Sequence, residues 1–289
     1  MSASSLQNPT LVVALGEQLY CVERPFFDHK GAGGVSDVAV DEAGLIHVLI
    51  RTDCLVTPQT DAVVSLSADG REIGRWGGAL IKDAHMLAAG PDGRIAIVDR
   101  DAHEIVICKD GKRISALGQR DRPLSPFNHP TDLAFAPDGT FYVSDGYANH
   151  KIHRFGATGE YLGSFGEYGS APGAFITPHA LWVQPDGSLV VVDRENDRLQ
   201  HFDPEGGLLD IWTGFVKPLD VWGDKDGTLY VTDLVPALTK LAPDGTRLGR
   251  CRPVLNAAHG ICGDGHGALY LAEPSPSRVT KLTPLPSSV

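Results

Sequence analysis

The chain has 289 residues, of which 42% are hydrophobic and 21% charged, a composition typical of a soluble globular protein with a sizeable core. The formal net charge of -11 disfavours nucleic acid and anionic membranes as partners, because no basic stripe is available to bind phosphate or lipid headgroups. A small carboxylate-bearing substrate is compatible with this charge, since it needs only one or two arginines at the site.

The first residues carry no recognisable targeting segment. They lack a basic start, and their apolar run at residues 11–15 is only five residues long, too short for a signal peptide or a membrane span. The five cysteines are scattered and include no C-x-x-C pair, so neither a disulfide framework nor a cysteine-based zinc site is expected. We therefore expect a cytoplasmic protein. Residues 18–26 follow and are predicted to form a β-strand.

From residue 36 onward the sequence repeats six times. Each copy contains an alternating apolar run, an Asp-Gly type turn and a β-rich run, which predicts a hairpin closed by a two-residue turn. Two further short runs, such as residues 151–155 and 161–165, complete each copy with a third and a fourth strand. Four antiparallel strands every 40–49 residues are typical of a propeller blade.

The predicted fold is therefore all-β, a single six-bladed propeller of the NHL type over residues 1–289, with few helices. The blades are expected to begin near residues 36, 85, 131, 179, 219 and 259. The sixth copy ends in the residues PLPSSV, which cannot supply a fourth strand. We expect the strand at residues 18–26 to take that place in the last blade, because closure removes the open sheet edges of the ring.

One column of the repeat alternates in residue type. At the start of each copy the residues are Ser36, His85, Thr131, His179, Leu219 and His259. The first strand of a propeller blade lines the central channel, so copies two, four and six place three imidazoles about 120° apart around one axis. Three histidines with an open fourth position are a typical catalytic zinc site, although imidazole also suits other divalent transition metals. The alternative is that these histidines are unrelated polar residues of the channel.

Three further columns lie at the exit of the second strand. The first is acidic and is expected to accept backbone N–H bonds within the loop leaving that strand; its members are Asp99, Asp145, Asp193, Asp233 and Glu273. The next two columns vary, and include Arg51, Arg100 and Arg194 followed by Tyr147. If these residues lie at the same end of the propeller as the three histidines, the arginines could bind a carboxylate and the tyrosine could transfer a proton. The alternative is a rim of surface arginines.

With these residues assembled, the chain resembles the peptidyl-α-hydroxyglycine α-amidating lyases, which are NHL-repeat propellers. The resemblance is carried best by PTDLAFAPDGTFYVSDGYANHKIHRF and VVDRENDRLQHF, within residues 127–203. It implies a lyase that splits a carbinolamide, R–CO–NH–CH(OH)–COO⁻, into an amide and glyoxylate. His85, His179 and His259 match the family's zinc ligands, and Tyr147 matches the proposed base. Arg51 matches the arginine for the substrate carboxylate, and Arg194 a further active-site arginine.

The chain departs from the family at several positions. The resemblance implies a structural calcium bound by the backbone of Val38 and Leu87 and by an aspartate after the third histidine, but Gly260 stands at that last position. Ala257 replaces a pocket methionine. Both halves of two disulfides are replaced, which fits a reducing compartment, and no monooxygenase domain accompanies the lyase-like region. We therefore expect a stand-alone enzyme with a substrate other than a peptide.

Two other functions are compatible with a propeller. The first is a metal-dependent hydrolase or lactonase, for which the resemblance of shape to gluconolactonases implies calcium bound by acidic and amide side chains in the channel. The second is a non-catalytic NHL interaction module, which gives no reason for histidines in alternate copies.

Overall fold

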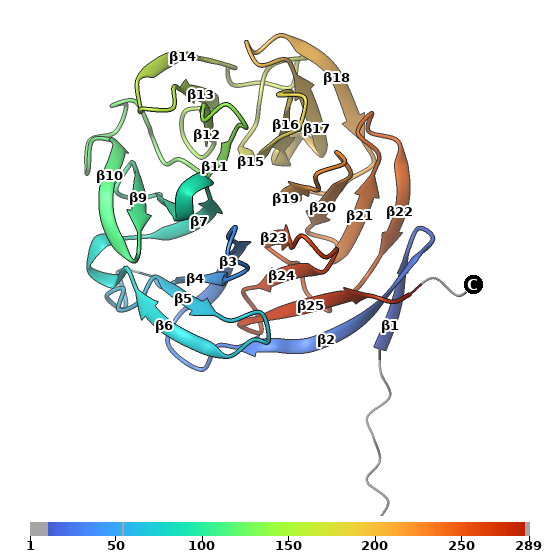
Figure 1. Cartoon of the computed structure of the whole chain (residues 1–289). Helices are drawn as coiled ribbons and strands as arrows, with labels where there is room; N and C mark the ends of the chain where they lie inside the picture. Colours follow the sequence, from blue (N-terminus) through green and yellow to red (C-terminus); the bar gives the residue numbers. More distant parts are fainter. Residues whose placement is uncertain (1–10, 54, 287–289) are drawn as a thin grey trace, which may run out of the picture.

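The computed structural model describes residues 11–53 and 55–286, and within them the chain forms six antiparallel sheets arranged in a ring (Figure 1). The innermost strands are β3 (Gly34–Val40), β7 (Ala84–Ala89), β11 (Asp132–Phe135), β15 (Pro178–Val183), β19 (Pro218–Gly223) and β23 (Gly260–Gly263). The second strands are β4 (Ile46–Arg51), β8 (Arg94–Asp99), β12 (Phe141–Asp145), β16 (Leu189–Asp193), β20 (Leu229–Asp233) and β24 (Leu269–Glu273).

The outer half of each blade completes the sheet. The third strands are β5 (Val63–Leu66), β9 (Glu104–Lys109), β13 (Lys151–Phe155), β17 (Arg198–Phe202), β21 (Ala237–Leu241) and β25 (Arg278–Pro284). The outermost strands are β6 (Glu72–Trp76), β10 (Lys112–Gly118), β14 (Tyr161–Phe165), β18 (Leu208–Thr213), β22 (Arg247–Cys251) and β2 (Gln18–Asp28). The predicted six-bladed propeller is confirmed.

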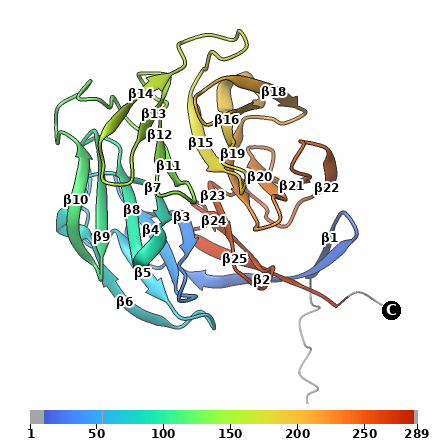
Figure 2. The same cartoon turned by 45° about the horizontal axis from the view of Figure 1, so that its top comes forward.

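Ring closure uses the N-terminal segment as expected. Strand β2 pairs antiparallel with β25, for example through Val22 and Leu282, and so becomes the fourth strand of the last blade. The sequence did not predict the fifth strand of that sheet, β1 (Leu11–Leu15), which pairs with β2 on its outer side (Figure 2). Leu15 is fully buried in a core cluster with Tyr230 and Leu238 of the preceding blade, so its burial stabilises the closure.

The turns between the first and second strands of the blades differ from the expected two-residue type. In the third blade the N–H of Ala136 donates to the carbonyl of Thr140 at 2.7 Å, and the N–H of Gly139 donates to the carbonyl of Ala136 at 2.9 Å. Three residues therefore form the loop, and Gly139 has a left-handed φ of 87°. This is a type I turn followed by a glycine, a common three-residue hairpin connection. The prediction of a two-residue turn was wrong.

Three of the acidic residues at the ends of the second strands, Asp99, Asp145 and Asp193, accept backbone N–H bonds from another loop than expected. Asp145 accepts from the N–H of Asn128 at 2.8 Å, and Asp193 accepts from the N–H of Ile176 at 2.8 Å. Both donors lie in the loop that enters the first strand of the same blade. The leaving loop contributes a side chain instead, since the amide of Asn149 donates to Asp145 at 2.7 Å. An antiparallel pair brings both loops to one end of the blade, which sequence order does not reveal.

Apolar packing lies between neighbouring blades. One core cluster joins Val98 of β8, Phe141 of β12, Val192 of β16 and Val231 of β20. Because the blades stabilise one another along their faces, the central channel can carry polar residues. The described helical segments are short 3-10 turns, so none could span a membrane; they are Gly78–Leu80, Pro91–Gly93 and Arg194–Asn196.

Candidate metal centre

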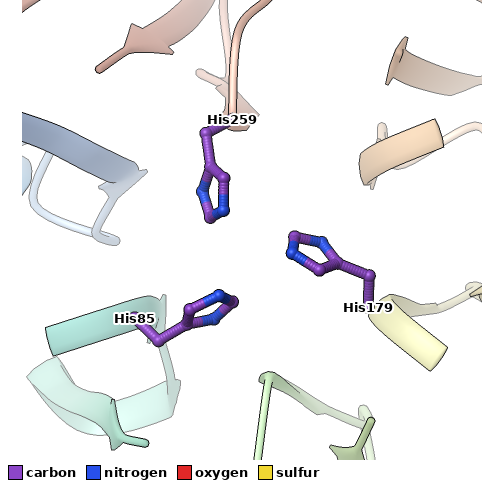
Figure 3. A group of neighbouring side chains, drawn as sticks. All are labelled: His85, His179 and His259. Carbon is purple, nitrogen blue, oxygen red and sulfur yellow. The ribbon is translucent and has the colours of Figure 1, made fainter. Parts of the chain in front are cut away.

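Three histidines meet at one end of the channel, and their rings point toward a common centre (Figure 3). His85 lies on β7, His179 on β15, and His259 directly precedes β23. The ring centroids are 5.1 to 5.2 Å apart, and one ring nitrogen of each lies within 4.8 Å of the other two. In the part of the chain that the structure describes, no other trio of His, Cys, Asp or Glu side chains brings its ligand atoms so close. The structure thus brings together the three predicted metal ligands.

The backbone of the intervening blades orients each imidazole. Nδ1 of His85 lies 2.6 Å from the carbonyl oxygen of Thr131, and Nδ1 of His179 lies 2.6 Å from that of Leu219. Nδ1 of His259 lies 2.9 Å from the carbonyl oxygen of Ser36. A carbonyl can only accept, so each Nδ1 carries the proton and each Nε2 presents a lone pair to the channel axis. This arrangement orients metal-binding histidines in proteins.

Burial keeps the three imidazoles neutral. It lowers the pKa of His85 and of His179 well below the usual value, with the neighbouring imidazoles of the trio adding to the effect. Burial also lowers the pKa of His259 to about 4. A metal binds the unprotonated ring, so the ligands are ready for an ion at neutral pH. The donor set, its tautomers and its charge state all fit a divalent transition metal.

Tyr147 reaches the same centre from the loop after β12. Its hydroxyl oxygen lies 2.9 Å from Nε2 of His85 and 3.3 Å from Nε2 of His179. The guanidinium carbons of Arg100 and Arg194 lie 5.4 and 5.5 Å from the centre of its ring, within range of cation–π attraction. The tyrosine is therefore held by the two blades that flank its own. Arg194 lies over the ring of Tyr147, and its charge, after burial and the charge of His259, also lowers the pKa of His179.

Arg51 lies at the mouth of the channel, on the side of His259. Both residues line a cavity of about 470 Å³, together with Arg100 and Asp83. Nε and Nη2 of Arg51 donate to the two carboxylate oxygens of Asp83 at 2.7 and 3.2 Å, and Nε of Arg100 lies 2.7 Å from the same carboxylate. One buried aspartate thus orients two guanidinium groups. Arg100, which lines this cavity, also lies over the ring of Tyr147, so the cavity and the tyrosine share a neighbour.

Some residues of the site were not predicted from the sequence. Asp83 stands two positions before the first histidine and outside every repeat column considered above. A second group was visible in the alignment, because the column immediately after the histidine column reads Asp37, Met86, Asp132, Ala180, Asp220 and Gly260. Its aspartates occupy the copies that lack a histidine.

Val38 and Leu87, whose backbone the family resemblance implies as calcium ligands, lie beside the carboxylate of Asp37. Asp37 accepts the N–H of Val38 at 2.8 Å and that of Leu87 at 2.9 Å, so both of its oxygens are bonded to the protein. A Cβ atom at Gly260 would lie 1.9 Å from the carboxylate of Asp37. A side chain at position 260 and the present placement of Asp37 are therefore incompatible.

The fold defines the class of the protein as a six-bladed β-propeller. The NHL repeat family model matches residues 127–155. Among solved structures, the chain is similar to a gluconolactonase from Xanthomonas campestris, with 17% identity and a TM-score of 0.74 over 97% of this chain and 96% of that one. It is also similar to a streptogramin B lyase, with 13% identity and a TM-score of 0.67 over 94% and 100%. At these identities the similarity concerns the fold alone.

Sequence relatives point to one group within this class. The chain is 30% identical over 203 residues to a probable peptidyl-α-hydroxyglycine α-amidating lyase of Caenorhabditis elegans, covering 61% of this chain and 57% of the relative. It is 32% identical over 147 residues to an amidating lyase of Drosophila melanogaster, covering 46% and 27%. A peptidyl-glycine α-amidating monooxygenase of Xenopus laevis is 38% identical over 134 residues, covering 43% and 14%. The resemblance to this group is confirmed, although the chain spans less than two thirds of these relatives.

Proposed function

We propose that the protein is a zinc-dependent lyase that cleaves the C–N bond of an α-hydroxyglycine-type carbinolamide, giving an amide and glyoxylate or a related oxo acid. The observation that carries this proposal is the convergence of three unprotonated Nε2 atoms with the hydroxyl of Tyr147. The relatives named as amidating lyases support the same reaction class.

The proposed ion would be held by His85, His179 and His259. Three neutral imidazoles are a common ligand set for catalytic zinc. When bound, zinc supplies Lewis acidity that favours loss of a proton from a hydroxyl group of the substrate.

The side chains around the trio would bind the substrate and move its proton. Arg51 faces the cavity beside His259 and would hold the substrate carboxylate. Tyr147 would accept the hydroxyl proton at its phenol oxygen and pass a proton to the amide nitrogen. As the C–N bond breaks, the carbinol carbon becomes the aldehyde carbon of glyoxylate. Neither water nor an oxidant is consumed.

The substrate's other half and the location of the protein belong to the same proposal. The cavity of about 470 Å³ suits a small N-acyl or N-carbamoyl group. We also propose a cytoplasmic location, for which the four cysteines that the structure describes as free give support; Cys54 lies outside the described residues.

The direct test supplies the purified enzyme with a panel of N-acyl and N-carbamoyl α-hydroxyglycines and measures both products. A lyase releases glyoxylate and an intact amide in equal amounts, above the spontaneous decomposition of the substrate. Hydrolysis of the same compounds would release a carboxylic acid and ammonia. If the metal-bound enzyme forms no product from any member of the panel, the proposed reaction is contradicted.

The two alternatives give different results in the same preparation. A lactonase would open sugar lactones and leave the carbinolamides unchanged. A non-catalytic interaction module would carry no metal after dialysis.

A further inference from the structure

Three buried aspartates form a second layer in the channel. Asp37, Asp132 and Asp220 belong to the first, third and fifth blades, so they alternate with the histidines around the ring. All three are buried, and they line a cavity of about 130 Å³. None of them contacts the substrate cavity beside Arg51. The proposed reaction assigns them no role.

Each aspartate is bonded to the strand of a histidine in a neighbouring blade. Asp37 accepts the N–H of Leu87 at 2.9 Å, Asp132 that of Leu181 at 3.0 Å, and Asp220 that of Ile261 at 2.7 Å. These donors share one position, two residues after His85, His179 and His259 respectively. The carboxylates therefore fix the backbone that carries the three imidazoles.

These bonds combine with the imidazole–carbonyl bonds into a closed ring of six. His85 donates forward to Thr131 in the third blade, while Leu87 on the same strand donates backward to Asp37 in the first. The fourth blade forms the same two bonds, from His179 to the following blade and from Leu181 to the preceding one. The sixth blade forms them through His259 and Ile261. Every histidine strand is thus tied to both of its neighbours.

We propose that Asp37, Asp132 and Asp220 are positioning residues of the metal centre, which set the distance between the three histidine strands and so the affinity for the ion. This inference rests on the metal centre of the proposed function and does not depend on the reaction that the enzyme catalyses. Such residues act through the ligands, and their loss typically lowers metal affinity by about 10- to 100-fold.

A carboxylate suits this role because each of its two oxygens accepts a hydrogen bond. Asp220 accepts the N–H of Val221 at one oxygen and that of Ile261 at the other, both at 2.7 Å. An asparagine keeps the volume but can accept through only one of its terminal atoms, so one of the two bonds is lost. Burial raises the pKa of Asp220 to about 7, and the backbone bonds from Ile261 and Val221 act in the opposite direction.

The test compares two substitutions in the fifth blade, which contributes no histidine to the centre. Asp220→Asn leaves one acceptor oxygen for the two N–H groups of Val221 and Ile261, so one of these two bonds is lost. Asp233→Asn is the matched control, because Asp233 is equally buried at the end of β20 and bonds to Arg250 away from the channel. Zinc affinity is measured by competition with a chromophoric chelator, and the geometry of the site by the absorption spectrum of the cobalt-substituted protein.

We expect Asp220→Asn to weaken zinc binding by roughly 10- to 100-fold and to alter the cobalt spectrum. Asp233→Asn should lower the melting temperature but retain the wild-type affinity and spectrum. If Asp220→Asn does not fold, Asp132→Asn tests the same bond in the third blade. Equal zinc affinity and spectra in all variants would overturn the inference. A wild-type protein that binds no zinc would overturn both the metal centre and this inference, whereas zinc binding without glyoxylate release would contradict the proposed reaction alone.

Discussion

The hydroxyl oxygen of Tyr147 lies 2.9 Å from Nε2 of His85, the atom that this histidine offers to a metal. The two residues are 62 positions apart and come from neighbouring blades. A group that transfers a proton must stand within hydrogen-bond distance of the group that gives or takes that proton. The contact therefore links the candidate metal centre to the candidate proton-transfer group.

Tyr147→Phe is expected to lower kcat by on the order of 10²- to 10⁴-fold, because it removes the proton-transfer group and little else. Zinc content should stay at the wild-type level. Tyr142→Phe is the matched control, since the hydroxyl of Tyr142 bonds to the carbonyl of Pro204 at 3.0 Å, away from the centre. Equal kcat values for the two variants, measured by glyoxylate release, would rule out this role for Tyr147.

The purified protein should retain about one equivalent of zinc per chain after dialysis, as shown by elemental analysis. His85→Ala, His179→Ala and His259→Ala should each lose most of it, because two imidazoles hold the ion less tightly than three. His266→Ala serves as the control, since His266 is exposed in a hairpin turn. Full zinc occupancy in all three channel variants would disprove the ligand assignment.

Arg51→Lys is expected to lower kcat/KM by roughly 10- to 100-fold, since it keeps the charge but loses part of a charge-assisted hydrogen-bonding pattern. Zinc content should be unchanged. Arg75→Lys in the same blade is the control, because Arg75 forms a two-point ion pair with Glu72 at the outer edge. The preference for the acid over its neutral amide analogue should fall in Arg51→Ala. An unchanged preference would show that Arg51 does not bind the carboxylate.

Zinc binding at pH 6 should release almost no protons from the histidines. A histidine with the usual pKa of about 6.5 is largely protonated at pH 6, so three of them would release roughly two protons. Here burial lowers each pKa, to about 4 in His259, so the rings are already neutral at that pH. Calorimetry in buffers of different ionisation enthalpy counts the protons. A release near two would mean that the imidazoles are exposed to solvent in the metal-free protein.

Much of the fold could be predicted because a blade is a local structure. Alternating apolar residues, a glycine at each turn and the spacing of the copies determine four antiparallel strands within about 45 residues, and six copies determine the ring. The same alignment predicted that His85, His179 and His259 line one channel, since equivalent positions of a repeat have equivalent places in the ring. Strand β1 escaped prediction because it repeats no part of a blade and is stabilised by contacts with distant residues such as Tyr230.

The sequence alone therefore determined which residues lie on the channel, through the periodicity of the repeat. Only the tertiary structure decided how those residues act on one another. The carbonyl of Thr131 that orients His85, the carboxylate of Asp83 that joins Arg51 to Arg100, and the contact of Tyr147 with His85 all cross between blades. Their distances depend on the angle at which each blade packs against the next. That angle is set by the apolar contacts of the whole ring, and no single copy of the repeat encodes it.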